Sequence, residues 1–319
     1  MKIKNRKITL IIIMVLPFAL IVIVEIFARY YLEIGNTTLF ISHPTIEYML
    51  RPNQLVEHRN SSVVVNHYGM RTINFPAIKN SPQELRVMVF GDSVINGGDG
   101  TDHYALATTI LHQQLESRES NSVVGNISAG SWGPGNWLAY IKEYGVFNAD
   151  VIVLIISSHD VADNPKFQPL KYDTPTAKPV VASWIALRTL FDWVMGEIYN
   201  NLSNATIANN AYLAQEAVAA MRDLNHFLTI AQQRAKEVIV LQHWERDEIL
   251  GKPYPGLLRI TQECQKLGIN PISLAPYFRE AIKNGINPFF DQIHLNQTGQ
   301  KLLAQIIWEQ LQSRLRPLK

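Results

Sequence analysis

The first hydrophobic cluster lies near the N-terminus. Residues Ile8–Val24 contain no charged side chain, and about 17 residues is the lower limit for a helix that crosses a bilayer. Basic residues precede this run and tyrosines follow it: Lys2, Lys4, Arg6, Lys7, Tyr30 and Tyr31. Because basic flanks stay cytoplasmic and aromatic residues favour the interface, residues 1–30 are expected to be a single-pass anchor with an exported body. A cleaved signal peptide is the alternative, but Glu25 and Phe27 stand where small residues would mark a cleavage site.

After residue 85, short apolar runs alternate with segments of helical periodicity. The expected strands are Arg86–Phe90, Val123–Ile127, Val151–Ile156, Val238–Leu241 and Asn270–Leu274. The expected helices are Tyr104–Arg118, Trp137–Tyr144, Ala211–Lys236, Leu257–Leu267 and Asn296–Leu315. Apolar strands separated by helices are typical of a parallel sheet covered on both faces. The pattern predicts an α/β fold, doubly wound and flavodoxin-like, with a five-stranded parallel sheet.

Two segments do not fit this alternation. Residues 31–84 are expected to be an extracytoplasmic lead-in with one or two short strands, and we assign no chemistry to them. The domain at 85–319 contains an insertion at about 164–209, because some 80 residues separate the third and fourth strands and a crossover needs only a dozen or more. Its residues Trp184, Leu187 and Phe191 have helical spacing. The insertion is expected to be a substrate lid over the sheet's carboxyl edge or a structural flap.

Composition excludes two classes of function. The 319 residues contain 29 Lys and Arg against 27 Asp and Glu, and four of the basic residues precede the apolar run. The near-neutral remainder lacks the basic surface that nucleic-acid binding requires, so no nucleic-acid partner is expected. Cys264 is the only cysteine, which excludes an intrachain disulfide, a cysteine-based zinc site and a CxxC redox motif.

The end of the first expected strand carries a candidate nucleophile. Phe90-Gly91-Asp92-Ser93 is followed by glycines at 97, 98 and 100. A serine at the carboxyl end of a parallel strand occupies the usual ligand-binding edge of this architecture. The sequence differs from the G-x-S-x-G elbow, because Ile95 replaces the second glycine, and no Gly-Lys-Ser/Thr follows to make a phosphate loop.

A candidate base lies near the C-terminus. Asp291 and His294 stand three residues apart between the last expected strand and the last expected helix. A hydroxyl nucleophile needs a base within hydrogen-bond reach and a third group that orients the base. Asp291 is expected to orient His294, which would then accept the proton of Ser93.

Together, Gly-Asp-Ser after the first strand and Asp-x-x-His before the last helix resemble the SGNH/GDSL hydrolase family. The resemblance covers roughly 85–315 without the insertion. It implies Ser93 as nucleophile, His294 as base and Asp291 as orienting acid, with no cofactor or metal. It also implies an oxyanion hole built from the Ser93 N–H and a glycine after the second strand, for which Gly130 matches best and Gly133 is the fallback.

The third block of the family departs from its pattern. Where members have Gly-x-Asn-Asp, this chain reads Ser157-Ser158-His159-Asp160. His159 stands at the position of the oxyanion-binding asparagine, and a neutral imidazole has one N–H that can take this role. Asn164 is an alternative donor.

A metal-dependent phosphoesterase is a further alternative. His159 and Asp160, together with Asp291 and His294, offer two imidazoles and two carboxylates, although no metal-binding spacing supports this. His103 and His112 are expected to be structural or surface residues.

The leading hypothesis is a serine-dependent O-acyl esterase or acyltransferase, with O-acetyl as the expected acyl group. Its expected substrate is a polysaccharide of the envelope or a secreted one, or a small acyl ester, and its expected location is the periplasmic side of the inner membrane. Polysaccharide-assembly proteins are possible partners. The alternatives are a non-catalytic glycan-binding or assembly protein with a degenerate site, and a lipase or thioesterase.

Overall fold

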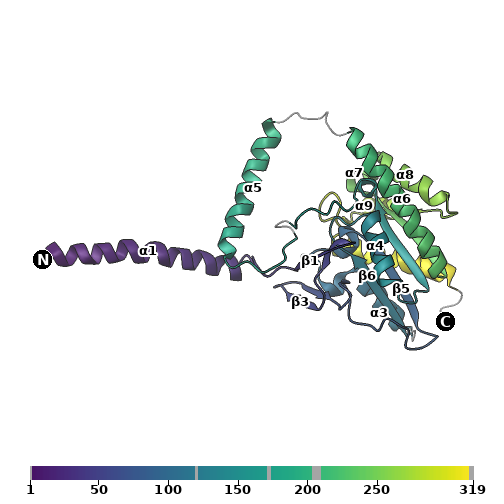
Figure 1. The fold of residues 1–319 in the computed structure, drawn as a ribbon, viewed down its shortest axis with the longest axis horizontal. Coiled ribbons are helices and arrows are strands. Elements are labelled where there is room, and N and C mark those ends of the chain that lie inside the picture. Colours follow the sequence, from purple (N-terminus) through teal and green to yellow (C-terminus); the bar gives the residue numbers. More distant parts are fainter. Residues whose placement is uncertain (1, 119–120, 171–173, 203–209, 316–319) are drawn as a thin grey trace. The chain divides into compact units, whose positions relative to one another are not determined.

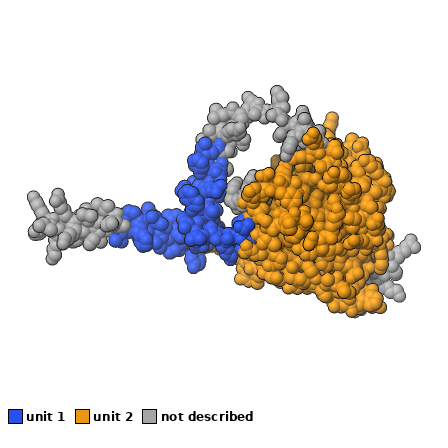
Figure 2. All heavy atoms as spheres, viewed as in Figure 1, with its two compact units in different colours: residues 1–39, 175–208 blue, residues 40–174, 209–319 orange. Residues whose placement is uncertain are grey.

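The computed structural model describes residues 2–118, 121–170, 174–202 and 210–315, without the side chains of 2–14, 193–194, 196–202 and 210–214. The chain forms two compact units. Figure 1 shows the ribbon coloured from the N-terminus to the C-terminus, and Figure 2 colours the two units separately. Unit 1 comprises residues 1–39 and 175–208, and unit 2 comprises 40–174 and 209–319. These boundaries differ from the expected ones, because residues 40–84 of the lead-in belong to unit 2. Most of the insertion joins the N-terminal helix in unit 1 instead.

Unit 2 contains the expected five-stranded parallel sheet. Its strands are β5 (Leu85–Gly91), β6 (Ser122–Ser128), β7 (Val151–Ser157), β8 (Glu237–His243) and β9 (Ile272–Ser273). All neighbouring pairs run parallel, in the order β6-β5-β7-β8-β9. The order reverses at β5, and in doubly wound sheets ligands bind at the carboxyl ends of strands beside such a reversal.

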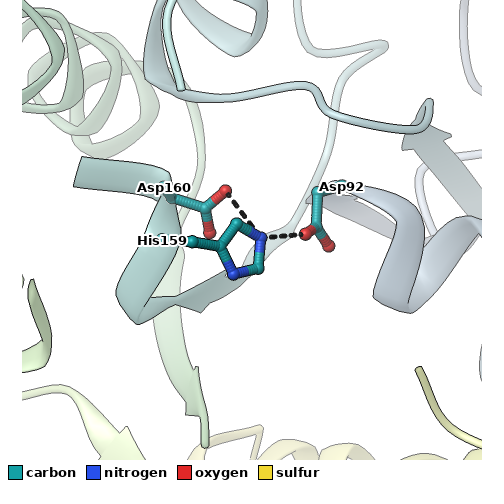
Figure 3. A group of neighbouring side chains, drawn as sticks. All are labelled: Asp92, His159 and Asp160. Carbon is teal, nitrogen blue, oxygen red and sulfur yellow. Dashed lines mark hydrogen bonds and ion pairs between the residues drawn. The ribbon is translucent and has the colours of Figure 1, made fainter. Parts of the chain in front are cut away.

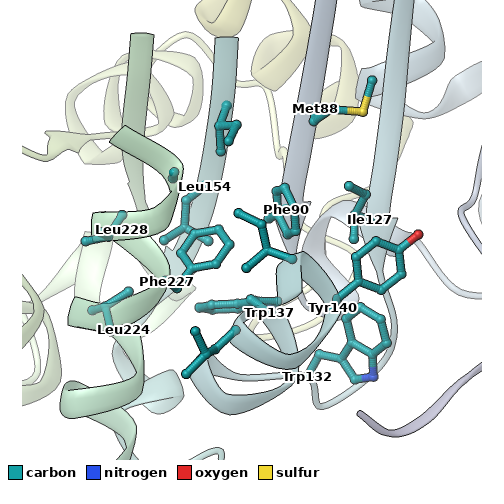
Figure 4. Packing of buried hydrophobic residues seen from close by; sticks show 14 of the residues in the cluster. Met88, Phe90, Ile127, Trp132, Trp137, Tyr140, Leu154, Leu224, Phe227 and Leu228 are labelled. Atoms are coloured by element: carbon teal, nitrogen blue, oxygen red, sulfur yellow. The ribbon is translucent and has the colours of Figure 1, made fainter. Parts of the chain in front are cut away.

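Alternate residues of each strand face opposite layers of helices. In β7, Ile152, Leu154 and Ile156 belong to one hydrophobic cluster and Val151, Val153 and Ile155 to the other. The first cluster contains residues of α4 (Pro134–Tyr144), α6 (Asn210–Arg234) and α8 (Pro255–Gln265). The second contains residues of α3 (Ala107–Glu116), α9 (Ala275–Lys283) and α10 (Gln297–Arg314). Figure 4 shows the first cluster, where Phe227 of α6 and Trp137 of α4 meet Phe90 and Leu154 of the sheet. Because both faces are covered, the strands are apolar on both sides, as the sequence pattern indicated.

Shorter elements complete unit 2. They are the helices α2 (Ser93–Asn96) and α7 (Arg246–Leu250) and the 3-10 turns η1 (His103–Ala105) and η2 (Ser158–Val161). Asn296 is the N-cap of α10, since its Oδ1 accepts hydrogen bonds from Thr298 N at 2.9 Å and Gly299 N at 3.0 Å. Helices α7 and α9 were not predicted.

The lead-in forms two antiparallel hairpins. They consist of β1 (Phe40–His43) with β2 (Glu47–Leu50), and β3 (Gln54–Glu57) with β4 (Ser62–Val65). Ile46, Met49 and Met70 are fully buried in the first hydrophobic cluster. The lead-in is therefore part of the core of unit 2.

Unit 1 contains α1 (Lys2–Tyr30) and α5 (Ala182–Leu202). The Glu25 carboxylate accepts hydrogen bonds from Ala182 N at 2.9 Å, Ser183 N at 2.9 Å and Ser183 Oγ at 2.7 Å. The bonds from Ser183 and Ala182 lower the pKa of Glu25 to about 2. Arg29 donates to the carbonyls of Pro179 and Val180. One turn of α1 thus caps the N-terminus of α5.

The expected membrane anchor falls within α1. Side chains 8–14 of the run Ile8–Val24 lie outside the described residues. Among the residues that are described, no helix combines the length and the apolar character needed to span a membrane.

Candidate active site

Ser93 lies at the carboxyl end of β5, where the chain enters the one-turn helix α2. The preceding Asp92 is the N-cap of this helix, because its Oδ1 accepts a hydrogen bond from Val94 N at 2.9 Å. Gly97 follows the helix with a φ of 74°, a left-handed conformation that glycine adopts without strain. The strand, the cap and the glycine together expose Ser93 at the sheet edge, where the sequence predicted a ligand site.

The structure brings Ser93, His294 and Asp291 together. His294 Nε2 lies 2.9 Å from Ser93 Oγ, and His294 Nδ1 lies 2.7 Å from Asp291 Oδ2. Since a carboxylate only accepts, Nδ1 carries the proton and Nε2 is free to accept the Ser93 hydroxyl proton. This is the geometry of an activated hydroxyl with an oriented base.

Backbone hydrogen bonds hold Asp291 in this position. Its Oδ1 accepts from the N–H groups of Ile293 and His294, both at 2.8 Å. Partial burial would raise the pKa of Asp291, but the hydrogen bonds from His294 and from the two backbone groups lower it below its ordinary value. Asp291 is therefore ionised at neutral pH and places a negative charge beside His294 Nδ1.

His243 supports the same loop from beneath, and the sequence analysis missed it. It is fully buried at the end of β8, and its Nε2 donates to the Ile293 carbonyl at 2.8 Å. Burial lowers the pKa of His243 to about 4, so the ring is neutral at pH 7. A histidine two residues after the apolar run Val238–Leu241 was the available signal.

Arg71 of the lead-in is a second missed residue. Its buried guanidinium donates to the carbonyls of Asn96, Gly98 and Thr101, each at 2.6 Å. Burial lowers the pKa of Arg71 to about 10, which still leaves it charged at neutral pH. These three bonds hold the end of α2 and the glycine loop, defined here as residues 97–101, which follow Ser93.

The lead-in also holds the loop that carries the expected oxyanion glycine. Tyr48 Oη donates to the Gly130 carbonyl at 2.6 Å, and Trp132 Nε1 donates to the Tyr48 carbonyl at 2.9 Å. In the described part of the chain no hydrogen bond of the Gly130 N–H is found. The fallback Gly133 is explained by packing, because a Cβ there would overlap the Asp163 carbonyl oxygen.

His159 has bonds that differ from those of an oxyanion donor. Its Nε2 lies 3.0 Å from Asp92 Oδ2 and its Nδ1 lies 3.1 Å from Glu245 Oε1. Burial alone would lower the pKa of His159, but the hydrogen bonds with Asp92 and Glu245 and the charges of Asp160 and Asp92 raise it to about 11. Both ring nitrogens point at carboxylates in this arrangement, so neither N–H is directed at a substrate oxygen. The oxyanion role of His159 stays a prediction that this geometry does not favour.

The remaining candidates lie away from the reacting atoms. Asn164 bonds to Gly135 N at 3.0 Å and to Asp223 Oδ2 at 3.1 Å, so its amide is already used. His103 is buried, and burial lowers its pKa to about 4. His112 lies 3.4 Å from Glu116 on α3. Asp291 and His294 do not join His159 and Asp160 in the metal-compatible group found among the described residues.

A cleft of about 490 Å³ opens beside Ser93 and His294. Its other walls are the glycine loop and the segment Phe290–Gln297. Phe290 is 81% exposed. The volume lies within the range of small-molecule sites, and most of the exposed lining is apolar.

No family model matches the sequence, and no curated protein matches it. Similar solved structures include a lipolytic protein of the G-D-S-L family from Veillonella parvula, with 14% identity, 72% of this chain and 100% of that chain covered, and a TM-score of 0.44. They also include a catalytic mutant of an acetylxylan esterase from Geobacillus stearothermophilus, with 13% identity, coverage of 73% and 95%, and a TM-score of 0.45. A third, TesA, has 15% identity, coverage of 72% and 99%, and a TM-score of 0.44.

Proposed function

We propose that this chain is a serine-dependent esterase or acyltransferase of the SGNH type, acting on O-acyl groups. The observation that carries the proposal is the Ser93–His294–Asp291 chain of hydrogen bonds, at 2.9 and 2.7 Å, at the mouth of a cleft. A buried or purely structural serine would need neither an oriented base nor access to a cleft.

In the proposed reaction, Ser93 Oγ attacks the acyl carbonyl carbon while its proton moves to His294 Nε2. The Ser93 and Gly130 N–H groups stabilise the oxyanion. Collapse of the tetrahedral intermediate breaks the acyl C–O bond, and His294 returns the proton to the leaving hydroxyl. Water or a second hydroxyl then attacks the acyl-serine with His294 again as base, which releases an acid or a new ester and restores the enzyme.

The proposed substrate is an O-acetylated polysaccharide of the envelope or a secreted one. An open cleft with the exposed ring of Phe290 at its edge favours a sugar-borne acyl group, because an aromatic ring can stack on a sugar face. Export through a membrane-anchoring N-terminal helix is part of the proposal and is supported by the charge-free run Ile8–Val24 with its basic flank.

The test is labelling of the full-length protein with a fluorophosphonate, which reacts only with an activated serine. We expect labelling of the wild type and its complete loss in Ser93→Ala. His294→Gln should label at least 100-fold more slowly, because the general base is lost. A matched control is Ser131→Ala, which changes another loop serine without touching the hydrogen-bond chain.

Absence of labelling in folded wild-type protein contradicts the enzyme proposal and favours the glycan-binding alternative. If labelling succeeds, acetate release from p-nitrophenyl acetate against octanoate release from its octanoyl analogue measures the acyl preference. A preference for octanoyl would move the proposal to a lipase or thioesterase.

A further inference from the structure

The structure holds a second group of converging side chains directly behind the nucleophile. Asp92 Oδ2, His159 Nε2 and Asp160 Oδ1 all lie within 4.8 Å of one another, and Figure 3 shows the imidazole nitrogen facing both carboxylates. We propose that these three atoms bind a divalent transition-metal cation, Mn²⁺ or Zn²⁺. The inference does not rest on the serine chemistry proposed above.

Asp160 is the strongest pointer to a ligand. It is completely buried, and its Oδ2 accepts a hydrogen bond from Ser157 N at 2.6 Å. Its Oδ1 has no hydrogen-bond partner among the described residues and lies 3.9 Å from His159 Nε2. If Asp160 is ionised, no hydrogen-bond donor in the described part of the chain reaches its Oδ1. If Asp160 is protonated at Oδ1, no acceptor in that part receives the proton. A buried polar atom without a partner is costly, and a cation at this position removes the cost.

The second ligand, His159, is oriented as metal-binding imidazoles are. Its Nδ1 lies 3.1 Å from Glu245 Oε1, so a neutral ring donates Nδ1–H to Glu245 and presents the lone pair of Nε2 to the other side. Ser158 Oγ in turn donates to Glu245 Oε1 at 3.2 Å. Such a carboxylate behind a histidine fixes the tautomer of metal ligands and makes the nitrogen more basic.

Charge balance favours a cation as well. Five carboxylates lie at or next to this group: Asp92, Asp160, Asp163, Glu245 and Glu248. Among the described residues, no lysine or arginine forms an ion pair with Asp92, Asp160 or Glu245. His159 supplies at most one positive charge to Asp92, Asp160 and Glu245, while Lys166 acts on Asp163. A divalent ion supplies two and lets His159 be neutral.

The distances suit an ion with mixed nitrogen and oxygen ligands. Nε2 lies 3.0 Å from Asp92 Oδ2 and 3.9 Å from Asp160 Oδ1. Both separations are shorter than twice the metal–ligand distance of about 2.1 Å, and the separation between the two carboxylates is within 4.8 Å, so small side-chain shifts would let one ion contact all three atoms. One imidazole with two carboxylates suits Mn²⁺ or Zn²⁺ better than Mg²⁺ or Ca²⁺, which prefer oxygen alone. The 29% exposure of the His159 side chain leaves an entry path and room for water ligands.

Metal binding exchanges the cation for a proton. Without metal, Nε2 shares its proton with Asp92 Oδ2; with metal, that proton leaves to solvent and the lone pair binds the ion. Because Asp92 Oδ1 caps α2 through Val94 N, the ion would also fix the turn that carries Ser93.

The experiment uses the full-length chain in detergent, stripped with a chelator and then titrated with MnCl₂ or ZnCl₂ alone. We expect one ion per chain by Mn²⁺ EPR, an unfolding midpoint that rises with Mn²⁺ or Zn²⁺ but not with equal Mg²⁺, and proton release on binding. Asp160→Asn, which is isosteric, should weaken binding at least 100-fold. Glu245→Gln should weaken it 10- to 100-fold.

Asp247→Asn is the matched control, since Asp247 is an exposed carboxylate outside the five and should bind as the wild type does. Should Asp160→Asn not fold, His159→Gln tests the same prediction. The proposal is overturned if stripped wild type binds no ion, or if Asp160→Asn binds Mn²⁺ as tightly as Asp247→Asn. His159 would then be a protonated imidazolium joining Asp92 to Glu245. Fluorophosphonate labelling with and without the ion separates the two failures, because Mn²⁺ binding is measured without reference to Ser93 and labelling of the metal-loaded protein reports the serine chemistry.

Discussion

Two segments lie outside the repeating α/β pattern, and they belong to different compact units. Residues 40–84 of the lead-in are part of unit 2. There, Arg71 and Tyr48 donate hydrogen bonds to carbonyls of the two loops that flank Ser93. The insertion residues 175–208 form unit 1 with α1, joined through Glu25 and Arg29. From the sequence pattern alone, the lead-in is expected to be an irregular segment without chemistry, and the insertion is expected to be a substrate lid or a structural flap. The lead-in supports the site through polar contacts of buried side chains, and the hydrophobic pattern of neither segment predicts such contacts.

The largest effect is expected for Arg71→Met, which tests whether the lead-in stabilises unit 2 and the site. The change leaves the carbonyls of Asn96, Gly98 and Thr101 without their buried donor, and we expect a loss of about 3 kcal/mol in the free energy of unfolding, with much slower fluorophosphonate labelling. The same change at Arg188 of α5 should cost less than about 0.5 kcal/mol, because Arg188 is exposed. Equal losses in urea unfolding would contradict the contrast between the segments.

The pH dependence of the unfolding free energy tests whether His243, at the end of β8, supports the site as Arg71 of the lead-in does. His243 has a pKa of about 4 in the folded chain against 6.5 unfolded. Its stabilising contribution is therefore complete above pH 6.5 and is lost as the pH falls towards 4, by about 2.5 kcal/mol between pH 7 and pH 4.5. We expect the unfolding free energy of His243→Gln to fall less over this range than that of the wild type.

His103→Gln is the matched control for this measurement, because His103 also has a pKa of about 4. It should show a similar gain in acid tolerance. Only His243→Gln should also slow labelling of Ser93, because only His243 bonds to the loop of His294. Slower labelling in both variants would mean that general destabilisation, not loop support, is responsible.

A smaller effect is expected for Trp132→Phe, which keeps the ring packing but removes the hydrogen bond to the Tyr48 carbonyl. The cost should be about 1–2 kcal/mol, since the carbonyl loses its donor. Trp184→Phe in α5, where the ring is exposed, should change thermal unfolding of unit 2 by less than about 0.5 kcal/mol. A larger effect at Trp184 would assign the insertion a structural part in unit 2.

The smallest effect on unit 2 is expected for Glu25→Ala. This change removes the acceptor for Ala182 N, Ser183 N and Ser183 Oγ. Limited proteolysis should cut more readily at 175–183, while labelling of Ser93 stays within twofold of the wild type. A large drop in labelling would show that α5 contributes to the site.

The sequence predicts the sheet and the reacting side chains because both depend on local signals. Apolar runs mark β5 to β8, and Ser93, Asp291 and His294 stand at strand and helix boundaries. Arg71 and His243 are not predictable in the same way, because their partners are backbone carbonyls 25 to 50 positions away. The neighbours of His159 are missed for the same reason: Glu245 lies 86 positions along the chain.

The hydrogen bond between Ser93 and His294 joins positions 201 residues apart. During synthesis, β5, the glycine loop and Ser93 leave the ribosome long before β8, β9 and the loop of His294 exist. Bringing such distant positions together is a late and entropically costly step in folding. A nascent or C-terminally truncated chain would therefore carry an inert serine. Reactivity of Ser93 would serve as a chemical signal that the whole of unit 2 has been assembled.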